Sequence, residues 1–245
     1  MSKNKKILGK WDFIFLLGES GAGKGTLVRN IMKYWLPNLM STSMGDIFRE
    51  KAKTDNEIKT LMDEGILIND SIVINMFHEF AINNHPGLID GFPRNRQQVI
   101  DSIKLIKEME WRVLVIDIFC DIEVIIERLL SRGRSDDKLS IMYKRYTDHK
   151  TLHPTVMEEI NNRPDLFDVI RLNGNTKADI AFTNFILDVF RLVDMLYLYE
   201  FNNCVPEFTV EENETTINPA INRFICDMLK KLQENLDEKH DKIIK

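Results

Sequence analysis

Residues 13–24 read FIFLLGESGAGK, a short apolar run followed by a glycine-rich loop of the pattern G-x-x-x-x-G-K. The apolar run predicts a buried strand, and the spacing of Leu27, Ile31 and Tyr34 predicts a helix that begins at Lys24. A loop of this kind between a strand and a helix lets consecutive backbone N–H groups converge on phosphate oxygens. The positive end of the helix and the charge of Lys24 add to that attraction. The stretch therefore predicts a phosphate-binding loop.

Strands and helices alternate along the chain beyond this loop, with Asn95 and Asp121 as predicted N-caps of two helices. Such alternation is typical of βαβ units, so the sequence predicts an α/β fold with a five-stranded parallel sheet. The predicted strands span residues 13–17, 39–41, 87–90, 112–119 and 169–172. The predicted helices span residues 24–35, 45–53, 56–64, 69–82, 95–109, 122–132, 136–150, 155–162 and 178–199.

Composition restricts the partners that the chain can have. Its 245 residues carry a formal net charge of −5, so no global positive field attracts nucleic acid or a membrane. The cysteines Cys120, Cys204 and Cys226 are far apart, which argues against a disulfide framework or a zinc site and favours a cytoplasmic location. The sequence predicts no signal peptide and no membrane-spanning helix, and nothing in it requires more than a monomer.

Further segments carry a more specific signal than the loop alone. In chain order they are KGT at 24–26, GDIFR at 45–49, GILIND at 65–70, DGFPR at 90–94, RLLSRGRSDD at 128–137, and Arg145. This ordered set resembles the adenylate kinases and their relatives among the nucleoside-monophosphate kinases, and DGFPR is its most specific member. The resemblance covers about residues 10–190. It implies an enzyme that uses Mg²⁺ and moves the γ-phosphoryl group of ATP to a nucleoside monophosphate.

The resemblance also implies a division of the chain. Residues 1–199 would form a P-loop kinase domain, with a helical monophosphate-binding insert at about residues 42–85 and a very short lid at about residues 128–140. Residues 200–245 lie beyond the family pattern. They predict an acidic linker and an amphipathic C-terminal helix, which we expect to dock on the helix predicted at residues 178–199.

Roles for individual residues follow from the same resemblance. The catalytic residues would be Lys24, Arg94, Arg128, Arg134 and Arg145, with Arg132 beside them. The ATP-binding residues would be Gly18, Ser20, Gly21, Ala22, Gly23, Lys24, Gly25, Thr26, Arg128 and Gly174. The monophosphate-binding residues would be Met44, Arg49, Ile68, Gly91, Arg94, Gln98, Arg134 and Arg145. Asp90 would contact Mg²⁺ through water, and Asp136 and Asp137 would order the arginines.

The chemistry of this reaction agrees with the residues present. Two nucleotides bring several negative charges into one site, and arginine suits them because its planar guanidinium grips phosphate in a bidentate way and stays protonated. The attacking phosphate oxygen is already ionised, so no general base is needed. The sequence offers no Ser-His-Asp, Cys-His or paired-carboxylate arrangement. Catalysis would rest on positioning and electrostatics.

The identity of the acceptor depends on two positions. Gln98 favours AMP, because pyrimidine-monophosphate kinases tend to carry asparagine there. Met44 stands where adenylate kinases usually carry threonine, and a thioether packs on a base but hardly reads it. AMP is the predicted acceptor, with UMP, CMP or another (deoxy)nucleoside monophosphate as the alternative. Met44 and the short lid also leave open a different class, a catalytically weak nucleotide-binding regulatory module.

Two further sets of residues invite an interpretation. His149 and His153 have the i,i+4 spacing of a helical zinc pair, but no third ligand is near and Pro154 follows, so they are predicted to lie on the surface. The three tryptophans, Trp11, Trp35 and Trp111, are predicted to pack in or around the core.

Overall fold

The computed structural model describes residues 6–133, residues 138–192 and Asp227. The elements are β1 (Phe13–Gly18), α1 (Lys24–Asn30), the π-helical segment η1 (Ile31–Trp35), β2 (Met40–Ser43), α2 (Met44–Lys51), α3 (Asn56–Asp63), α4 (Asp70–Asn83), β3 (Gly87–Asp90), α5 (Arg96–Glu108), β4 (Val113–Phe119), α6 (Ile122–Arg132), α7 (Leu139–Asn161), β5 (Phe167–Asn173) and α8 (Ala178–Leu192). The interpretations of Arg134, Asp136, Asp137 and the C-terminal extension fall outside the described residues.

The strands form one parallel sheet in the order β2-β3-β1-β4-β5, which confirms the predicted five-stranded α/β core. Phe13 of β1 lies between Gly87 of β3 and Val113 of β4, and Val113 pairs in turn with Phe167 of β5. Because the strands are parallel, their carboxyl ends meet at one edge. Open α/β sheets bind ligands at this edge, where the chain order of the strands reverses.

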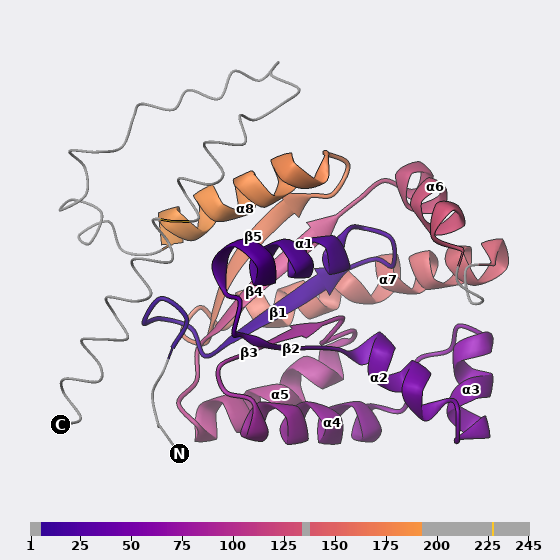
Figure 1. Cartoon of the computed structure of the whole chain (residues 1–245). Coiled ribbons are helices and arrows are strands. Elements are labelled where there is room, and N and C mark those ends of the chain that lie inside the picture. The colour runs from indigo at the N-terminus through magenta and orange to yellow at the C-terminus, as the bar shows by residue number, and fades with distance from the viewer. Residues whose placement is uncertain (1–5, 134–137, 193–226, 228–245) are drawn as a thin grey trace.

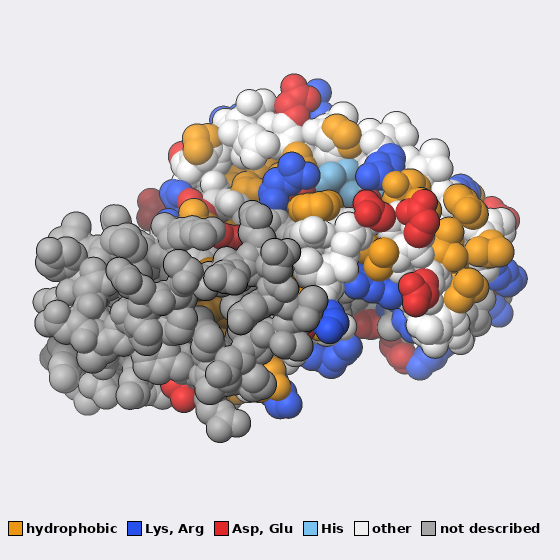
Figure 2. Space-filling view, turned by 90° about the horizontal axis from the view of Figure 1, so that it is seen from above, with side chains coloured by type: hydrophobic (Ala, Val, Ile, Leu, Met, Phe, Trp, Pro, Cys, Tyr) orange, Lys and Arg blue, Asp and Glu red, His pale blue; other side chains and the backbone are white. Residues whose placement is uncertain are grey.

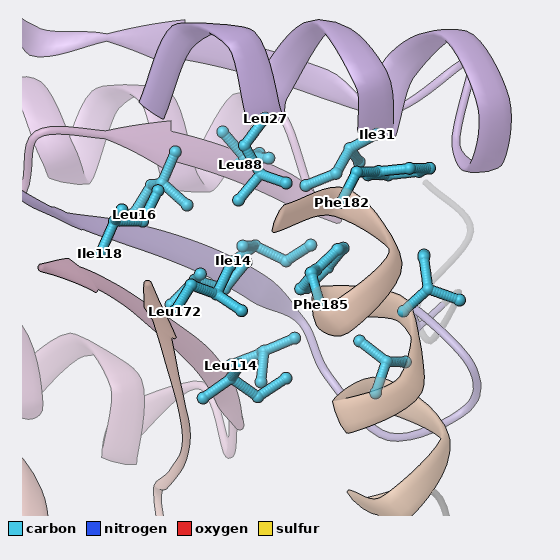
Figure 3. Packing of buried hydrophobic residues seen from close by; sticks show 14 of the residues in the cluster. Ile14, Leu16, Leu27, Ile31, Leu88, Leu114, Ile118, Leu172, Phe182 and Phe185 are labelled. Carbon is cyan, nitrogen blue, oxygen red and sulfur yellow. The ribbon is translucent and has the colours of Figure 1, made fainter. Parts of the chain in front are cut away.

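Helices cover both faces of the sheet (Figure 1). The helices α1 and α8 lie on one face, and α4, α5 and much of α7 lie on the other. Figure 3 shows the packing of α8 on the first of these faces, where Phe185 lies beside Ile14 of β1 and Phe182 lies beside Ile31. Strand residues that point to opposite faces therefore build two separate apolar layers. The three tryptophans are buried in these layers or at their ends, as predicted.

The helices predicted at residues 136–150 and 155–162 are a single helix, α7, which continues through Pro154. The two-helix prediction is wrong because it gave the proline too much weight. Pro154 is exposed, whereas Met142, Val156 and Ile160 are buried on either side of it. The packing of this stripe offsets the cost of about 3 kcal/mol that a proline brings to a helix interior.

Two other predicted helices differ from the structure at their ends. The helix predicted at residues 24–35 changes from α1 to the π-helical segment η1 at Ile31, and both Ile31 and Trp35 are buried there. The helix predicted at residues 178–199 is described as α8 as far as Leu192.

Asp121 is the N-cap of α6, as predicted, but its carboxylate makes no capping hydrogen bond and instead accepts one from Asn175 Nδ2 at 3.0 Å.

The surface carries charges of both signs. Figure 2 shows Lys and Arg interspersed with Asp and Glu on the described part of the face seen from above, which fits a chain without a single-sign field. Within the described ranges, none of the helices has the length and the apolar character that crossing a bilayer requires.

A buried carboxylate connects three segments of the chain at the start of the sheet. The side chain of Asp12, directly before β1, is only 2% exposed and forms an ion pair with Lys6 at 3.0 Å. Its oxygens also contact His85 Nε2 at 2.7 Å and accept the Arg112 backbone N–H at 2.8 Å. Burial alone would raise the pKa of Asp12, but the hydrogen bonds from His85, Arg112 and Lys6 outweigh it, so the pKa lies below its usual value.

We expect Asp12→Ala to lower the free energy of unfolding at neutral pH by about 3 kcal/mol, because it leaves buried donors without their acceptor. A carboxylate whose pKa is lowered by folding stabilises the fold above its unfolded pKa of about 3.9, and this contribution is lost as the pH falls through the lower folded value. Urea denaturation at pH 7 and pH 3 measures both effects. Asp63→Ala, at an exposed position, is the control. An equal cost at both pH values would contradict the assignment to the Asp12 charge.

Candidate functional site

A cavity of about 820 Å³ lies at the carboxyl ends of the strands. The loops after β1, β3 and β5 form its floor, and α2, the loop between α3 and α4, α6 and α7 form its walls. The described elements of the predicted site therefore line one cavity, although they are spread over more than 150 residues of sequence.

The glycine-rich loop has the backbone conformation that its sequence predicts. Gly18 has φ 130° and Gly23, the N-cap of α1, has φ 110°, both in the region that side chains disfavour. A Cβ at Gly18 would also lie 2.3 Å from the Ile118 carbonyl oxygen of β4. Only glycine fits at this junction, because the loop starts where β1 and β4 are still paired.

Lys24 folds back over this loop. Its ammonium group donates to the carbonyl oxygens of Gly18 at 3.0 Å and Glu19 at 2.9 Å. Burial lowers the pKa of Lys24; the charge of Asp90 acts in the opposite direction, and the charge of Arg94 lowers the pKa further. A phosphate bound in the loop would add a direct anionic partner for this desolvated cation.

Asp90 ends β3 in the middle of the cavity floor. Its Oδ1 is buried and has no hydrogen-bond partner among the residues that the structure describes. A buried carboxylate oxygen in this condition calls for a water molecule or a cation. No group of three or more His, Cys, Asp or Glu side chains that could hold a metal ion occurs within the described ranges, so protein side chains there provide no complete metal cage.

Three arginines that line the cavity, Arg49, Arg94 and Arg145, lie near one another. Arg94 lies deep in the cavity, with its Nε donating to the Gly91 carbonyl oxygen at 2.9 Å, while its guanidinium still reaches solvent in the open cleft. Burial lowers the pKa of Arg94, Asp90 partly offsets this, and the cations Arg145 and Arg49 lower it further. Since these cations repel one another, an anion bound between them would relieve the repulsion.

The remaining contacts hold these arginines in place. Arg49 pairs with Asp46 on α2, and Arg145 Nη2 donates to the Met62 carbonyl oxygen at 3.4 Å. On the side of the glycine-rich loop, Arg128 Nη1 lies 3.4 Å from the Ala22 carbonyl oxygen. This arrangement places α6 directly against the loop.

Gln98 also lines the cavity, and its side chain is almost fully buried. Its Oε1 accepts the Arg94 backbone N–H at 2.8 Å, and its Nε2 donates to Asp70 Oδ1 at 2.7 Å. Asp70 also accepts from Asn95 Nδ2 at 2.8 Å. The amide orientation of Gln98 is therefore fixed, which leaves one N–H and one oxygen lone pair for a ligand. Met44 is also buried and lines the same end of the cavity.

The structure brings the predicted site residues together within the described ranges. Arg134 lies outside them. Arg132, for which the sequence gave the weakest case, also lines the cavity. Gly174 lies close to the loop, since a Cβ there would be 2.7 Å from the Ala22 carbonyl oxygen. The predicted residues that line the cavity are Gly18, Ser20, Gly21, Ala22, Gly23, Lys24, Gly25, Thr26, Met44, Arg49, Ile68, Asp90, Gly91, Arg94, Gln98, Arg128, Arg145 and Gly174.

The surface prediction for His149 and His153 is wrong. Both side chains are half-buried and line the cavity, where His149 Nδ1 lies 3.2 Å from Glu19 Oε1 and His153 Nε2 lies 2.9 Å from Asp117 Oδ1. A signal was available, because the two histidines share the i, i+4 and i, i+3 spacing of the buried Val156 and Ile160. Sequence reasoning also missed Glu19 and Asp70, whose roles depend on contacts between distant segments.

Comparison with known proteins agrees with this geometry. A family model described as adenylate kinase matches residues 16–165. UMP-CMP kinase 1 of Oryza sativa subsp. japonica is 31% identical over 181 residues, which cover 71% of this chain and 72% of that protein. An adenylate kinase of Flavobacterium psychrophilum is 34% identical over 152 residues, covering 55% and 78% of the two chains. A uridylate kinase of Saccharomyces cerevisiae is 33% identical over 159 residues, covering 59% and 76%.

Proposed function

The chain belongs to the adenylate kinase family and is a nucleoside-monophosphate kinase, and from this premise we propose that it transfers the γ-phosphoryl group of Mg-ATP to AMP to form two ADP. One observation carries the proposal. The cavity has two cationic walls, the glycine-rich loop with Lys24 and the cluster of Arg49, Arg94 and Arg145, and Asp90 lies between them. Two phosphate-bearing ligands can thus face each other in one space.

We assign the loop and Lys24 to the β- and γ-phosphates of ATP, and the arginine cluster to the phosphate of the acceptor. Between them the cations offset the repulsion between the two anions and stabilise the charge of the transition state. The acceptor phosphate oxygen attacks in its ionised form, so no side chain has to remove a proton. Arg128 and Arg132 of α6 also line the cavity and would add positive charge around the transferred phosphoryl group.

We place a magnesium ion next to Asp90. The buried Oδ1 without a partner suits a water molecule of the ion's hydration shell, because Mg²⁺ keeps several of its waters and binds carboxylate and phosphate oxygens. Magnesium would supply charge neutralisation at the phosphates of ATP. Asp90 would orient the hydrated ion and also partly offset the charges of Lys24 and Arg94.

Gln98 supports AMP as the acceptor. Its fixed amide offers one donor and one acceptor side by side, which matches the N1 and N6 groups at the edge of adenine. The same pair also matches a pyrimidine edge, and the buried Met44 adds apolar contact without a hydrogen bond. Two of the relatives carry the names UMP-CMP kinase and uridylate kinase. UMP or CMP is therefore the second candidate.

We expect kcat/KM for AMP to exceed that for UMP and CMP by about tenfold, the amount by which a well-aligned polar contact of Gln98 with adenine would exceed a poorly aligned one with a pyrimidine. Initial rates of the full chain with Mg-ATP and each of AMP, dAMP, UMP, dUMP, CMP and dCMP measure this preference. A higher value for UMP or CMP would replace AMP as the acceptor and would leave the rest of the site assignment intact.

A further inference from the structure

The glycine-rich loop contains an acidic side chain, Glu19, where an anion is to bind. The Glu19 side chain is only 4% exposed, and its Oε2 has no hydrogen-bond partner within the described ranges. Its Oε1 lies 3.2 Å from His149 Nδ1 and 3.9 Å from Lys150 Nζ. Burial would raise the pKa of Glu19, but the contact with His149 outweighs it and lowers the pKa, so the carboxylate is ionised at neutral pH.

An ionised carboxylate beside a phosphate site weakens anion binding unless a cation compensates it. Lys150 is a poor candidate for this task, because its side chain is 55% exposed and its charge is screened by solvent. His149 is closer and its side chain is only 22% exposed. His149 is therefore the closer of the two α7 contacts of Glu19, and the charge of Lys24 also interacts with this carboxylate.

A second acid–histidine pair holds the ring of His149 in place. The ring of His153 stacks on that of His149 with centroids 4.4 Å apart and an interplanar angle of 18°. His153 in turn contacts Asp117 of β4, which is also 3.3 Å from Arg171 Nε. Each histidine thus faces its own buried carboxylate, and a fixed stack holds His149 against Glu19.

Glu19 is also connected to Lys24. The backbone carbonyl oxygen of Glu19 accepts a hydrogen bond from Lys24 Nζ at 2.9 Å, while its side chain extends to α7. The contact with His149 therefore anchors the peptide that holds the ammonium group at the phosphate site.

We propose that His149 is a positioning residue for ATP, whose imidazole holds the Glu19 side chain beneath the glycine-rich loop and so keeps the Glu19 carbonyl oxygen on Lys24. The inference rests on the proposed function only in placing ATP phosphates at the loop.

A double-mutant cycle tests the proposal. The full chain, His149→Gln, Glu19→Gln and the double variant are titrated calorimetrically with Mg²⁺ and the β,γ-imido analogue of ATP at pH 7. We expect His149→Gln to raise the Kd about tenfold, because the Glu19 side chain loses its contact with α7. In the Glu19→Gln background this change should fall below about twofold. Lys150→Gln, which removes an exposed charge from the same turn of α7, is the matched control.

The cycle separates loss of the Glu19 contact from a general structural effect. If His149→Gln weakens binding equally with and without the Glu19 carboxylate, the proposal is wrong. A Kd of His149→Gln within about twofold of that of the unchanged chain would also contradict it. Circular dichroism of each variant checks that it is folded. Because no acceptor is present, failure of AMP as a substrate would not affect the result.

Discussion

Replacing Lys24 with Met lowers kcat for phosphoryl transfer by about 10³-fold, with little change in the fold. Lys24 is the cation held over the glycine-rich loop, and the charge on the phosphates that it faces increases in the transition state. Loss of one preorganised donor at developing charge costs on the order of 10²–10³ in rate. Methionine keeps the length and the apolar stem of lysine, so the helix that begins at this residue should remain intact.

Steady-state kinetics and circular dichroism measure this effect and the integrity of the fold. Lys59→Met is the matched control, because Lys59 is exposed on α3 and does not line the cavity. We expect the control to retain normal turnover. A Lys24→Met enzyme within tenfold of the unchanged chain would show that the loop is not the phosphate site.

Arg94→Ala raises the KM for the acceptor by about 10- to 100-fold, the amount expected for the loss of a charged hydrogen bond to phosphate. The KM for ATP should change less than about threefold, because we assign ATP to Lys24 and the glycine-rich loop. The variant keeps the backbone N–H of Arg94, which donates to Gln98 Oε1, so the base end of the site stays in place.

Arg96→Ala is the control for this variant. Arg96 is two residues further along the chain, but its side chain is 58% exposed and pairs with Glu159 at 3.0 Å, outside the cavity. Initial rates with each substrate varied in turn separate the two KM values. Equal increases for ATP and the acceptor would remove Arg94 from the acceptor site.

The sequence predicted the sheet and the conformation of the glycine-rich loop well because their signals are local. Residues 13–24 carry the apolar run, the glycines and Lys24 within one stretch, and the alternation of elements around them implies a parallel sheet. DGFPR at 90–94 likewise places Asp90 and Arg94 on either side of a turn at the end of a strand. In such cases a short segment determines both its conformation and its position at the sheet edge.

The contacts that the sequence did not reveal join segments far apart in the chain. Glu19 and His149 meet only because α7 passes beneath the loop after β1. Gln98 is fixed by Asp70, which comes from the start of α4. The continuity of α7 through Pro154 also depends on packing against the sheet, and propensity alone favours a break. Pairing of this kind follows from the tertiary fold and leaves no pattern in a single sequence.

The most direct test of the central claim follows the phosphoryl group itself. The full chain is incubated with Mg²⁺, AMP and ATP that carries a radioactive γ-phosphate, and the products are separated by chromatography. The account predicts that the label appears in the β-position of ADP and that its appearance requires AMP. Label that stays in ATP, or that is released only as inorganic phosphate, would contradict it, even if both nucleotides bind.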